Sequence, residues 1–238
     1  MPNWTYNRIK CKKSIGDKIL TITENGYSFD FNKLIPMPDD LKLDAGSIEG
    51  DSIACYYLSL NDDEKNKLMK LLKSKEASYC HNYWNKYKDD IKKLENNPKR
   101  LNKKINNFNG LFDFDKEKQF TSINELGKQY VENIKKYNFP QWYDWCVKNW
   151  GTKWNVEEDV DIVYDKNIDE YDISFQTAWS VPTGIVKRYS ELCEDDEEFY
   201  WEYEDEDYDG THILRKINGE IIDTIVPECV NDNDYIDV

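Results

Sequence analysis

Alternating apolar and polar positions predict β-strands in the first and last parts of the chain. The segments with this pattern are 4–11, 160–164, 171–175, 199–203, 212–217 and 221–226. Residues 14–17 are typical of a turn that closes the first segment. Asn218 and Gly219 join the last two segments, and this residue pair is the strongest short hairpin signal. The pattern therefore predicts a small antiparallel sheet.

Apolar residues spaced three and four apart predict helices between these strands. Asn61, followed by three acidic residues, starts a helical stretch that ends at Asn96 and comprises two helices with lysines on their outer faces. Ser122 and Glu125 form a capping box for a helix that ends near Asn138. Two shorter helices are expected over 142–150, before Gly151, and after Ser180. The prolines in 29–38 favour extended backbone instead.

This order of elements predicts an α+β fold. Strand, helix, two strands, helix and further strands fit a ferredoxin-like antiparallel sheet with helices on one face. We expect one domain formed by residues 1–60 and 111–226, interrupted by a basic helical insertion over 61–110. Residues 227–238 are expected to form a frayed acidic tail.

Charge is distributed very unevenly along the 238 residues. The chain carries 32 Lys and Arg against 47 Asp and Glu, a net charge of −15. Residues 157–238 contain 26 acidic against 5 basic residues, whereas 61–110 contain 13 basic against 7 acidic ones. Lysine outnumbers arginine 28 to 4, a bias typical of AT-rich genomes, so we expect an AT-rich bacterium, or its phage or plasmid, as the source. The uneven distribution of charge along the chain bears on its binding partners more than on its fold.

Cysteine spacing and hydropathy indicate the expected compartment. The six cysteines lie far apart without any C-x-x-C pair, so we interpret them as reduced packing residues and expect neither an iron–sulfur cluster nor a zinc site. An apolar segment of membrane-spanning length and a signal peptide are both lacking, so a cytoplasmic protein is expected.

Motifs for enzymatic chemistry are weak throughout the sequence. The glycine-rich nucleotide-binding motifs do not occur, and the two histidines stand in no catalytic context. Asp205 begins a D-x-D-x-D-G segment like that of an EF-hand, but Lys216 occupies the position that requires a bidentate glutamate. We therefore expect a non-enzymatic protein that needs no cofactor.

Three stretches nevertheless resemble one known family. They are a tryptophan-rich block over 142–155 (WYDWCVKNWGTKWN), the segment 175–182 (FQTAWSVP), and the opening made by 2–7 and 29–38. Together they are similar to the YubB-type ferredoxin-like domain family of phages and conjugative plasmids, whose usual form of the second motif is Phe-Asp-Thr-Ala-Trp-Ser-Pro-Pro. Gln176 and Val181 depart from that form.

The resemblance implies a ferredoxin-like fold without iron–sulfur chemistry, encoded by a mobile element. It supplies no catalytic residues. The block tryptophans Trp142, Trp145, Trp150, Trp154 and Trp179 suit a packed core better than a platform for stacking bases.

The densest charge in the chain predicts the binding site. Eleven carboxylates lie within residues 194–209, interrupted by aromatic residues. A phosphate-like array of carboxylates with aromatic anchors fits a protein groove that binds nucleic acid, although solvated acids also protect sheet edges from aggregation. The predicted partner-binding residues are Glu194, Asp195, Asp196, Glu197, Glu198, Tyr200, Trp201, Glu202, Glu204, Asp205, Glu206, Asp207 and Asp209.

The function expected from these observations is inhibition of a host defence protein. A phage or plasmid protein of this charge would mimic DNA and bind a nucleic-acid-dependent complex such as a CRISPR effector or a restriction enzyme. One alternative is a nucleic-acid-binding module that uses the basic insertion, through Lys86, Lys88, Lys92 and Lys93. A second alternative, sequestration of a nucleotide signal, has no motif in its favour.

Overall fold

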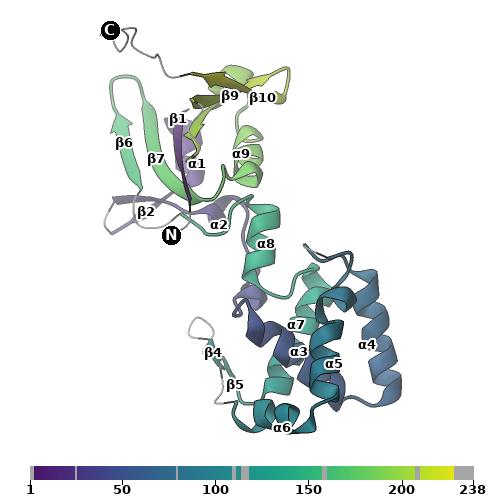
Figure 1. Ribbon diagram of the computed structural model, residues 1–238. Coiled ribbons are helices and arrows are strands. Elements are labelled where there is room, and N and C mark those ends of the chain that lie inside the picture. The colour runs from purple at the N-terminus through teal and green to yellow at the C-terminus, as the bar shows by residue number, and fades with distance from the viewer. Residues whose placement is uncertain are drawn as a thin grey trace, which may run out of the picture. The chain divides into compact units, whose positions relative to one another are not determined.

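The chain folds into two compact units (Figure 1). The computed structural model describes residues 3–24, 26–78, 80–108, 111–113, 118–156, 160–206 and 210–227. Residues 1–36 and 146–238 form the sheet unit, and residues 37–145 form the helical unit. The fold is α+β with an antiparallel six-stranded sheet, as predicted. The predicted frayed tail lies, apart from Pro227, outside the described residues.

The sheet has the strand order β10-β9-β8-β1-β7-β6, and every neighbouring pair is antiparallel. Its strands are β1 (Trp4–Lys12), β6 (Asp161–Asp165), β7 (Glu170–Ala178), β8 (Tyr200–Glu204), β9 (Thr211–Ile217) and β10 (Glu220–Val226). The predicted hairpin at Asn218 and Gly219 is confirmed, because both residues adopt the positive φ that such a turn requires.

Alternation along the central strands buries one face of the sheet. Ile9 on β1 lies opposite Ile173 on β7 and Trp201 on β8, and none of the three side chains is exposed to solvent. Residues two apart on a strand share a face, so the neighbouring odd-numbered positions of β1 and β7 are buried as well. This alternation fixes the register, because a shift by one residue would expose the whole core face.

Three short helices cover the buried face: α1 (Lys13–Ile19), α2 (Phe31–Leu34) and α9 (Thr183–Ser190). A Cβ at Gly16 would lie 2.2 Å from the Tyr171 ring, so glycine lets α1 approach β7. The rings of Phe31 on α2 and Phe175 on β7 lie 6.1 Å apart, and those of Tyr189 on α9 and Trp201 lie 5.9 Å apart. Aromatic contacts of this kind join α2 and α9 to the sheet.

Two of these helices correct the sequence-based expectations. The predicted turn over 14–17 lies inside α1, where burial of Ile15 and Ile19 outweighs the turn preference of Gly16. The predicted extended segment 29–38 contains the single turn of α2, because the Asp30 side chain accepts a hydrogen bond from the Asn32 backbone and the first proline follows only at Pro36. Beside α2, β2 (Leu20–Thr23) and β3 (Gly26–Phe29) form a separate hairpin.

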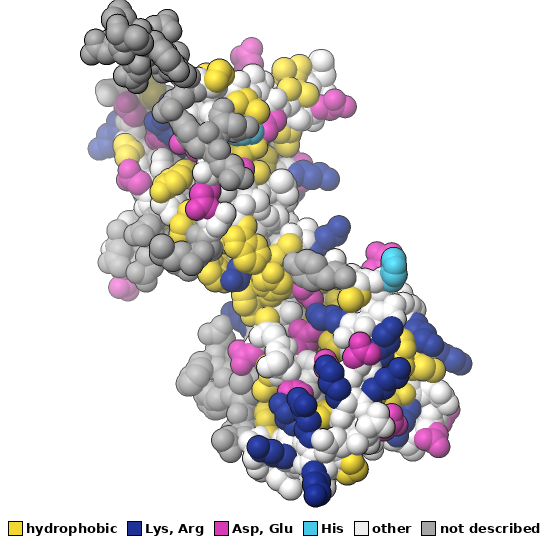
Figure 2. Space-filling model, viewed as in Figure 1, with side chains coloured by type: hydrophobic (Ala, Val, Ile, Leu, Met, Phe, Trp, Pro, Cys, Tyr) yellow, Lys and Arg dark blue, Asp and Glu magenta, His cyan; other side chains and the backbone are white. Residues whose placement is uncertain are grey.

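The helical unit contains most of the helix in the chain. Its elements are η1 (Asp39–Leu41), α3 (Ser47–Ser59), α4 (Asp62–Ser74), α5 (Tyr83–Glu95), α6 (Pro98–Asn106), β4 (Leu111–Asp113), β5 (Lys118–Phe120) and α7 (Ile123–Tyr137). The boundary with the sheet unit falls within α8 (Trp142–Asn149). Asn61 and Ser122 cap α4 and α7 as predicted, by accepting the backbone N–H of Glu64 and Glu125. Lys and Arg side chains gather on the face of this unit that Figure 2 presents.

The hydrophobic core of the helical unit shows why it is larger than the predicted insertion. The core joins side chains of α3, α4, α5 and α7, so segments on both sides of 61–110 belong to one cluster. A Cβ at Gly127 on α7 would lie 2.0 Å from the Ser52 carbonyl oxygen on α3, so glycine permits this close helix contact. The unit therefore begins at Met37 and ends at Trp145 rather than spanning 61–110.

A buried ion network ties three parts of the helical unit together. Lys86 on α5 pairs with Glu49 on α3 at 2.8 Å and with Asp144 at 3.1 Å, and both carboxylates are about 3% exposed. Tyr87 donates a 2.5 Å hydrogen bond to Glu49, and Gln141 donates one of 3.0 Å. Burial alone would lower the pKa of Lys86, but attraction to Glu49 and Asp144 outweighs it and raises that pKa. Lys86 is therefore charged and structural.

We expect Lys86→Met to lower the free energy of unfolding of the helical unit by about 3–5 kcal/mol, because it leaves two buried carboxylates without their cation. Lys92→Met is the matched control, since Lys92 is exposed, and its effect should stay within about 0.5 kcal/mol. Urea unfolding followed by circular dichroism measures both. Equal stability of the two variants would contradict the structural role of Lys86.

Candidate functional site

The face of the sheet opposite the helices is open to solvent. Tyr6, Arg8 and Lys10 alternate with the buried residues of β1 and therefore project from this open face. A groove of about 600 Å³ runs across it, lined by Tyr6, Asn7, Arg8, Val160, Asp161, Ser174, Phe175, Gln176, Glu202, Tyr203, Glu204 and Thr211. Five strands, β6, β7, β1, β8 and β9, thus contribute to one surface.

Arg8 is the only cationic residue among those that line the groove, and two carboxylates neutralise it. Its guanidinium donates two hydrogen bonds to Asp172, at 2.8 and 2.6 Å, and a third to Glu202 at 3.2 Å. The fork of parallel bonds to Asp172 is the strongest geometry for such a pair. The hydrogen bond to Asp172 is the main cause that raises the pKa of Arg8. Arg8 is therefore engaged within the protein.

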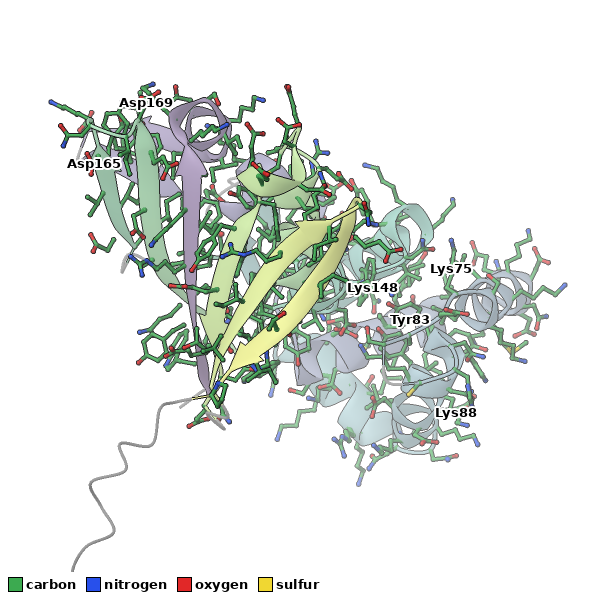
Figure 3. All side chains as sticks on the ribbon, turned by 90° about the horizontal axis from the view of Figure 1, so that it is seen from above. Lys75, Tyr83, Lys88, Lys148, Asp165 and Asp169 are labelled. Carbon is green, nitrogen blue, oxygen red and sulfur yellow. The ribbon has the colours of Figure 1, made fainter. Side chains whose placement is uncertain are left out.

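Carboxylates give the groove its negative charge. Asp161 on β6 is exposed and Glu204 on β8 is partly exposed, so two further acidic residues line the groove beside the arginine that Asp172 and Glu202 neutralise. Glu204 accepts a 2.7 Å hydrogen bond from Thr211, which fixes the carboxylate at the groove wall. Asp165 and Asp169 add further acidic side chains at the turn between β6 and β7 (Figure 3). The groove is consequently negative.

Aromatic side chains mark one end of the open face. Tyr6 is 57% exposed and lies opposite Gln176 and Glu204 in the sheet. Trp179, directly after β7, is 46% exposed and has a φ of 76°. This left-handed conformation costs a non-glycine residue on the order of 1–3 kcal/mol. Its backbone N–H donates to the Asn3 carbonyl oxygen at 2.8 Å, and the Lys153 ammonium lies 5.0 Å from its ring centroid. The surroundings thus hold an exposed tryptophan in a strained conformation.

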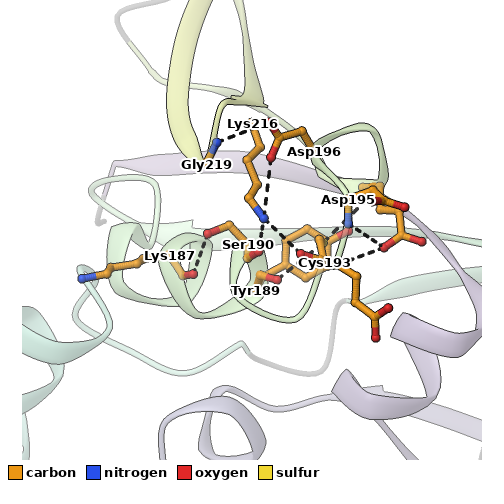
Figure 4. A network of polar contacts seen from close by, with 10 residues as sticks. Lys187, Tyr189, Ser190, Cys193, Asp195, Asp196, Lys216 and Gly219 are labelled. Atoms are coloured by element: carbon orange, nitrogen blue, oxygen red, sulfur yellow. Dashed lines mark hydrogen bonds and ion pairs between the residues drawn. The ribbon is translucent and has the colours of Figure 1, made fainter.

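The predicted acidic segment begins with a loop that is anchored to the sheet unit (Figure 4). Lys216 on β9 donates to the carbonyl oxygens of Ser190 and Cys193, at 3.2 and 3.0 Å, and lies 3.8 Å from Asp196. Asp196 also accepts from the Gly219 backbone at 3.3 Å. Glu198 accepts from Lys12 at 3.0 Å, and this hydrogen bond lowers the pKa of the carboxyl group. These acids therefore stabilise the loop.

The predicted partner-binding residues fall into several structural classes. Glu202, Glu204 and Tyr200 belong to the open face, where the Arg215 guanidinium lies 4.2 Å from the Tyr200 ring centroid. Asp205 accepts a 2.7 Å hydrogen bond from Thr5. Four acidic side chains are exposed to solvent: Glu194, Asp195, Glu197 and Glu206. Asp207 and Asp209 lie outside the described residues.

Trp201 corrects the prediction of an aromatic anchor. Its side chain is 0% exposed, and its indole N–H donates to Asn7 at 3.2 Å within the core. A residue without exposed surface cannot contact a partner protein. Exposed aromatic residues of this unit instead include Tyr6 and Trp179. The exposure of Trp179 corrects the expectation that it belongs to a packed core.

The four lysines expected to bind nucleic acid lie in different environments. Lys86 is partly buried and held by the ion network, and Lys93 pairs with Asp90 at 3.0 Å. Lys88 donates to Asn85 at 3.1 Å. Lys92 alone among the four is exposed without an ion pair in the described part of the chain. The predicted basic surface therefore does not form as proposed.

The segments that resemble a known family lie against one another. Thr152 donates to the Ala178 carbonyl oxygen and Ser180 to that of Gly151, both at 2.8 Å. The Trp150 indole N–H donates to the Ile35 carbonyl oxygen at 2.9 Å, and the Trp150 side chain is 2% exposed. Hydrogen bonds thus join these segments to one another within the sheet unit.

Comparisons with family models, with curated proteins and with solved structures found no match to this chain. Among the described residues, no group of three His, Cys, Asp or Glu side chains lies close enough to hold a metal ion. The helices in the described part of the chain are too short or too polar to cross a membrane.

We expect Trp201→Ala to lower the free energy of unfolding of the sheet unit by about 3–5 kcal/mol, because it removes a fully buried aromatic side chain. Tyr6→Ala should change it by less than about 0.5 kcal/mol, since more than half of that side chain is exposed. Thermal unfolding followed by tryptophan fluorescence and circular dichroism measures both. Similar losses in the two variants would contradict the assignment of the open and buried faces.

Proposed function

We propose that the protein is a non-enzymatic inhibitor that binds a host protein through the open face of its sheet. The observation that supports this most is the groove in which Asp161 and Glu204 lie near a single arginine that Asp172 and Glu202 already neutralise. A surface of this sign attracts a basic protein surface and repels phosphate.

The net charge of the whole sheet unit also favours a partner with a basic surface. The sheet unit carries 29 Asp and Glu against 13 Lys and Arg, whereas the helical unit carries 18 against 19. The basic surfaces of proteins that handle nucleic acids are complementary to such a unit. The open face would occupy the groove in which the host protein binds nucleic acid, and would thereby exclude that nucleic acid. We propose that a CRISPR effector, restriction enzyme or similar defence protein is inhibited in this way.

Exposed aromatic residues would provide the contact energy. Tyrosine and tryptophan dominate binding hot spots, because a large rigid side chain buries much surface at low entropic cost. Tyr6 lies in the groove and Trp179 follows β7, the strand that supplies Gln176 to it. Acidic residues would thus steer the partner, and these two aromatic side chains would anchor it.

The strand order supports the expected fold family. Counted along the chain, β1, β6, β7 and β8 form the order 4-1-3-2, and helices occur between the first two and between the last two. We infer a ferredoxin-like core of the split β-α-β type, with the helical unit inserted after β1 and a hairpin added beside β8. With the sequence motifs, this supports membership of the YubB-type family and a mobile-element protein that acts in the host cytoplasm.

Charge reversal at the groove tests the proposal. Asp161→Lys with Glu204→Lys should weaken binding to the captured host protein about tenfold or more, because like charges then face each other across the interface. The protein is captured from nuclease-treated lysate of the host bacterium, purified, and titrated against each variant by calorimetry.

Glu24→Lys with Glu220→Lys is the matched control, because both residues are exposed outside the groove and the change in net charge is the same. We expect the control variant to bind like the natural protein. Unchanged binding by the groove variant, or equal losses in both variants, would overturn the proposed site.

A further inference from the structure

We propose that α6 is a second binding site, which contacts the phosphate backbone of nucleic acid. This site lies in the helical unit and goes beyond the protein-binding function proposed for the sheet. The nine residues of α6, Pro98–Asn106, include Lys99, Arg100, Lys103 and Lys104 and no acidic residue. Four cations on one short helix form the electrostatic pattern typical of phosphate binding.

Three of these cations are available for a ligand. Lys99, Arg100 and Lys103 are exposed and form no ion pair with any residue that the structure describes. This distinguishes them from Arg8 and from Lys86, each of which pairs with two carboxylates. Figure 2 shows Lys and Arg side chains gathered on the face of the helical unit that is turned toward the viewer.

Several of the charges on α6 destabilise the helix. Lys99 and Lys103, and likewise Arg100 and Lys104, are like-charged pairs four residues apart, and each pair destabilises a helix by about 0.2–0.5 kcal/mol. Lys99 and Arg100 also lie in the first turn, where the helix dipole disfavours positive charge. The helix dipole favours Lys103 and Lys104 in the last turn, but the like-charged pairs and the two cations of the first turn cost stability, and such a local cost is typical of a binding function.

The inner side of α6 is fixed to the helical unit. Leu101 packs against the hydrophobic core, and Lys104 forms an ion pair with Asp51 on α3, whose side chain is 17% exposed. These contacts orient the helix and leave Lys99, Arg100 and Lys103 on its outer side. The site is therefore preorganised on a rigid element, which reduces the entropic cost of binding.

The chemistry of the site predicts contact with the backbone rather than with bases. The rise of a helix places Lys99 and Lys103 roughly 6 Å apart along its axis, which allows both to approach one strand. The α6 sequence contains no aromatic side chain on which a base could stack. We therefore infer weak binding of duplex nucleic acid without sequence preference, in the range of about 10⁻⁴–10⁻⁶ M at physiological salt.

Salt-dependent titration of the full chain tests the proposal. A short fluorescent DNA duplex of arbitrary sequence is the probe, and anisotropy at low and physiological salt gives the affinity and its salt dependence. Lys99→Gln, Arg100→Gln and Lys103→Gln combined should weaken binding at low salt about tenfold or more and lower the slope of log affinity against log salt by roughly 2–3. Because the substitutions remove like-charge repulsion, the melting temperature should not fall.

Lys70→Gln, Lys128→Gln and Lys135→Gln combined form the matched control. These lysines are exposed on α4 and α7, and the net charge changes equally. The control variant should keep the natural affinity and slope. Absence of duplex binding by the natural chain at low salt, or equal losses in both triple variants, would overturn the proposal. Salt-sensitive self-association in ultracentrifugation without duplex binding would also overturn it, by assigning α6 to the acidic sheet unit of a second copy.

Discussion

The pairing of β1 with β7 on one side and β8 on the other is the constraint on which the sheet unit depends. It brings residues 4–12 beside segments from the last third of the chain, and the buried side chains of Ile9 and its neighbours permit only one register. With that register fixed, the alternate residues of β1 must project from the open face. Arg8 then lies between Asp172 and Glu202, and Tyr6 between Gln176 and Glu204. The core and the groove are thus two consequences of one hydrogen-bonded ladder.

Burial and pairing, rather than the number of charges, decide what each charged residue can do. Arg8, Lys86 and Lys99 carry the same charge, but the first is neutralised by two carboxylates and the second is enclosed in an ion network. Lys99, by contrast, is exposed and forms no ion pair with any described residue, so it can bind an external anion. The acidic segment divides in the same way, because Glu198 and Asp196 stabilise a loop while Asp161 is open to a partner. The two units consequently offer surfaces of opposite chemistry.

Local signals made several elements predictable from the sequence. Asn61 and Ser122 cap their helices, and Asn218 with Gly219 forms the hairpin, because each depends on neighbouring residues alone. The sequence of α3 has no helical pattern of apolar residues, because this helix contacts the core on several of its sides. The extent of the helical unit, the burial of Trp201 and the pairing of Lys86 depend on contacts between distant segments. Those contacts give no local signal, and the candidate groove could therefore not be located from composition or charge density.

The central claim is that the open face of the sheet contacts a host protein directly, and site-specific photo-crosslinking tests it most directly. A photoreactive phenylalanine analogue replaces Tyr6 in the groove or, as the comparison, Tyr27 on the separate β2–β3 hairpin, whose side chain is 43% exposed. After irradiation in the host lysate, we expect the Tyr6 position to link to one basic nucleic-acid-handling protein and the Tyr27 position to link to none in comparable yield. Equal labelling from both positions, or no specific product from position 6, would contradict the account.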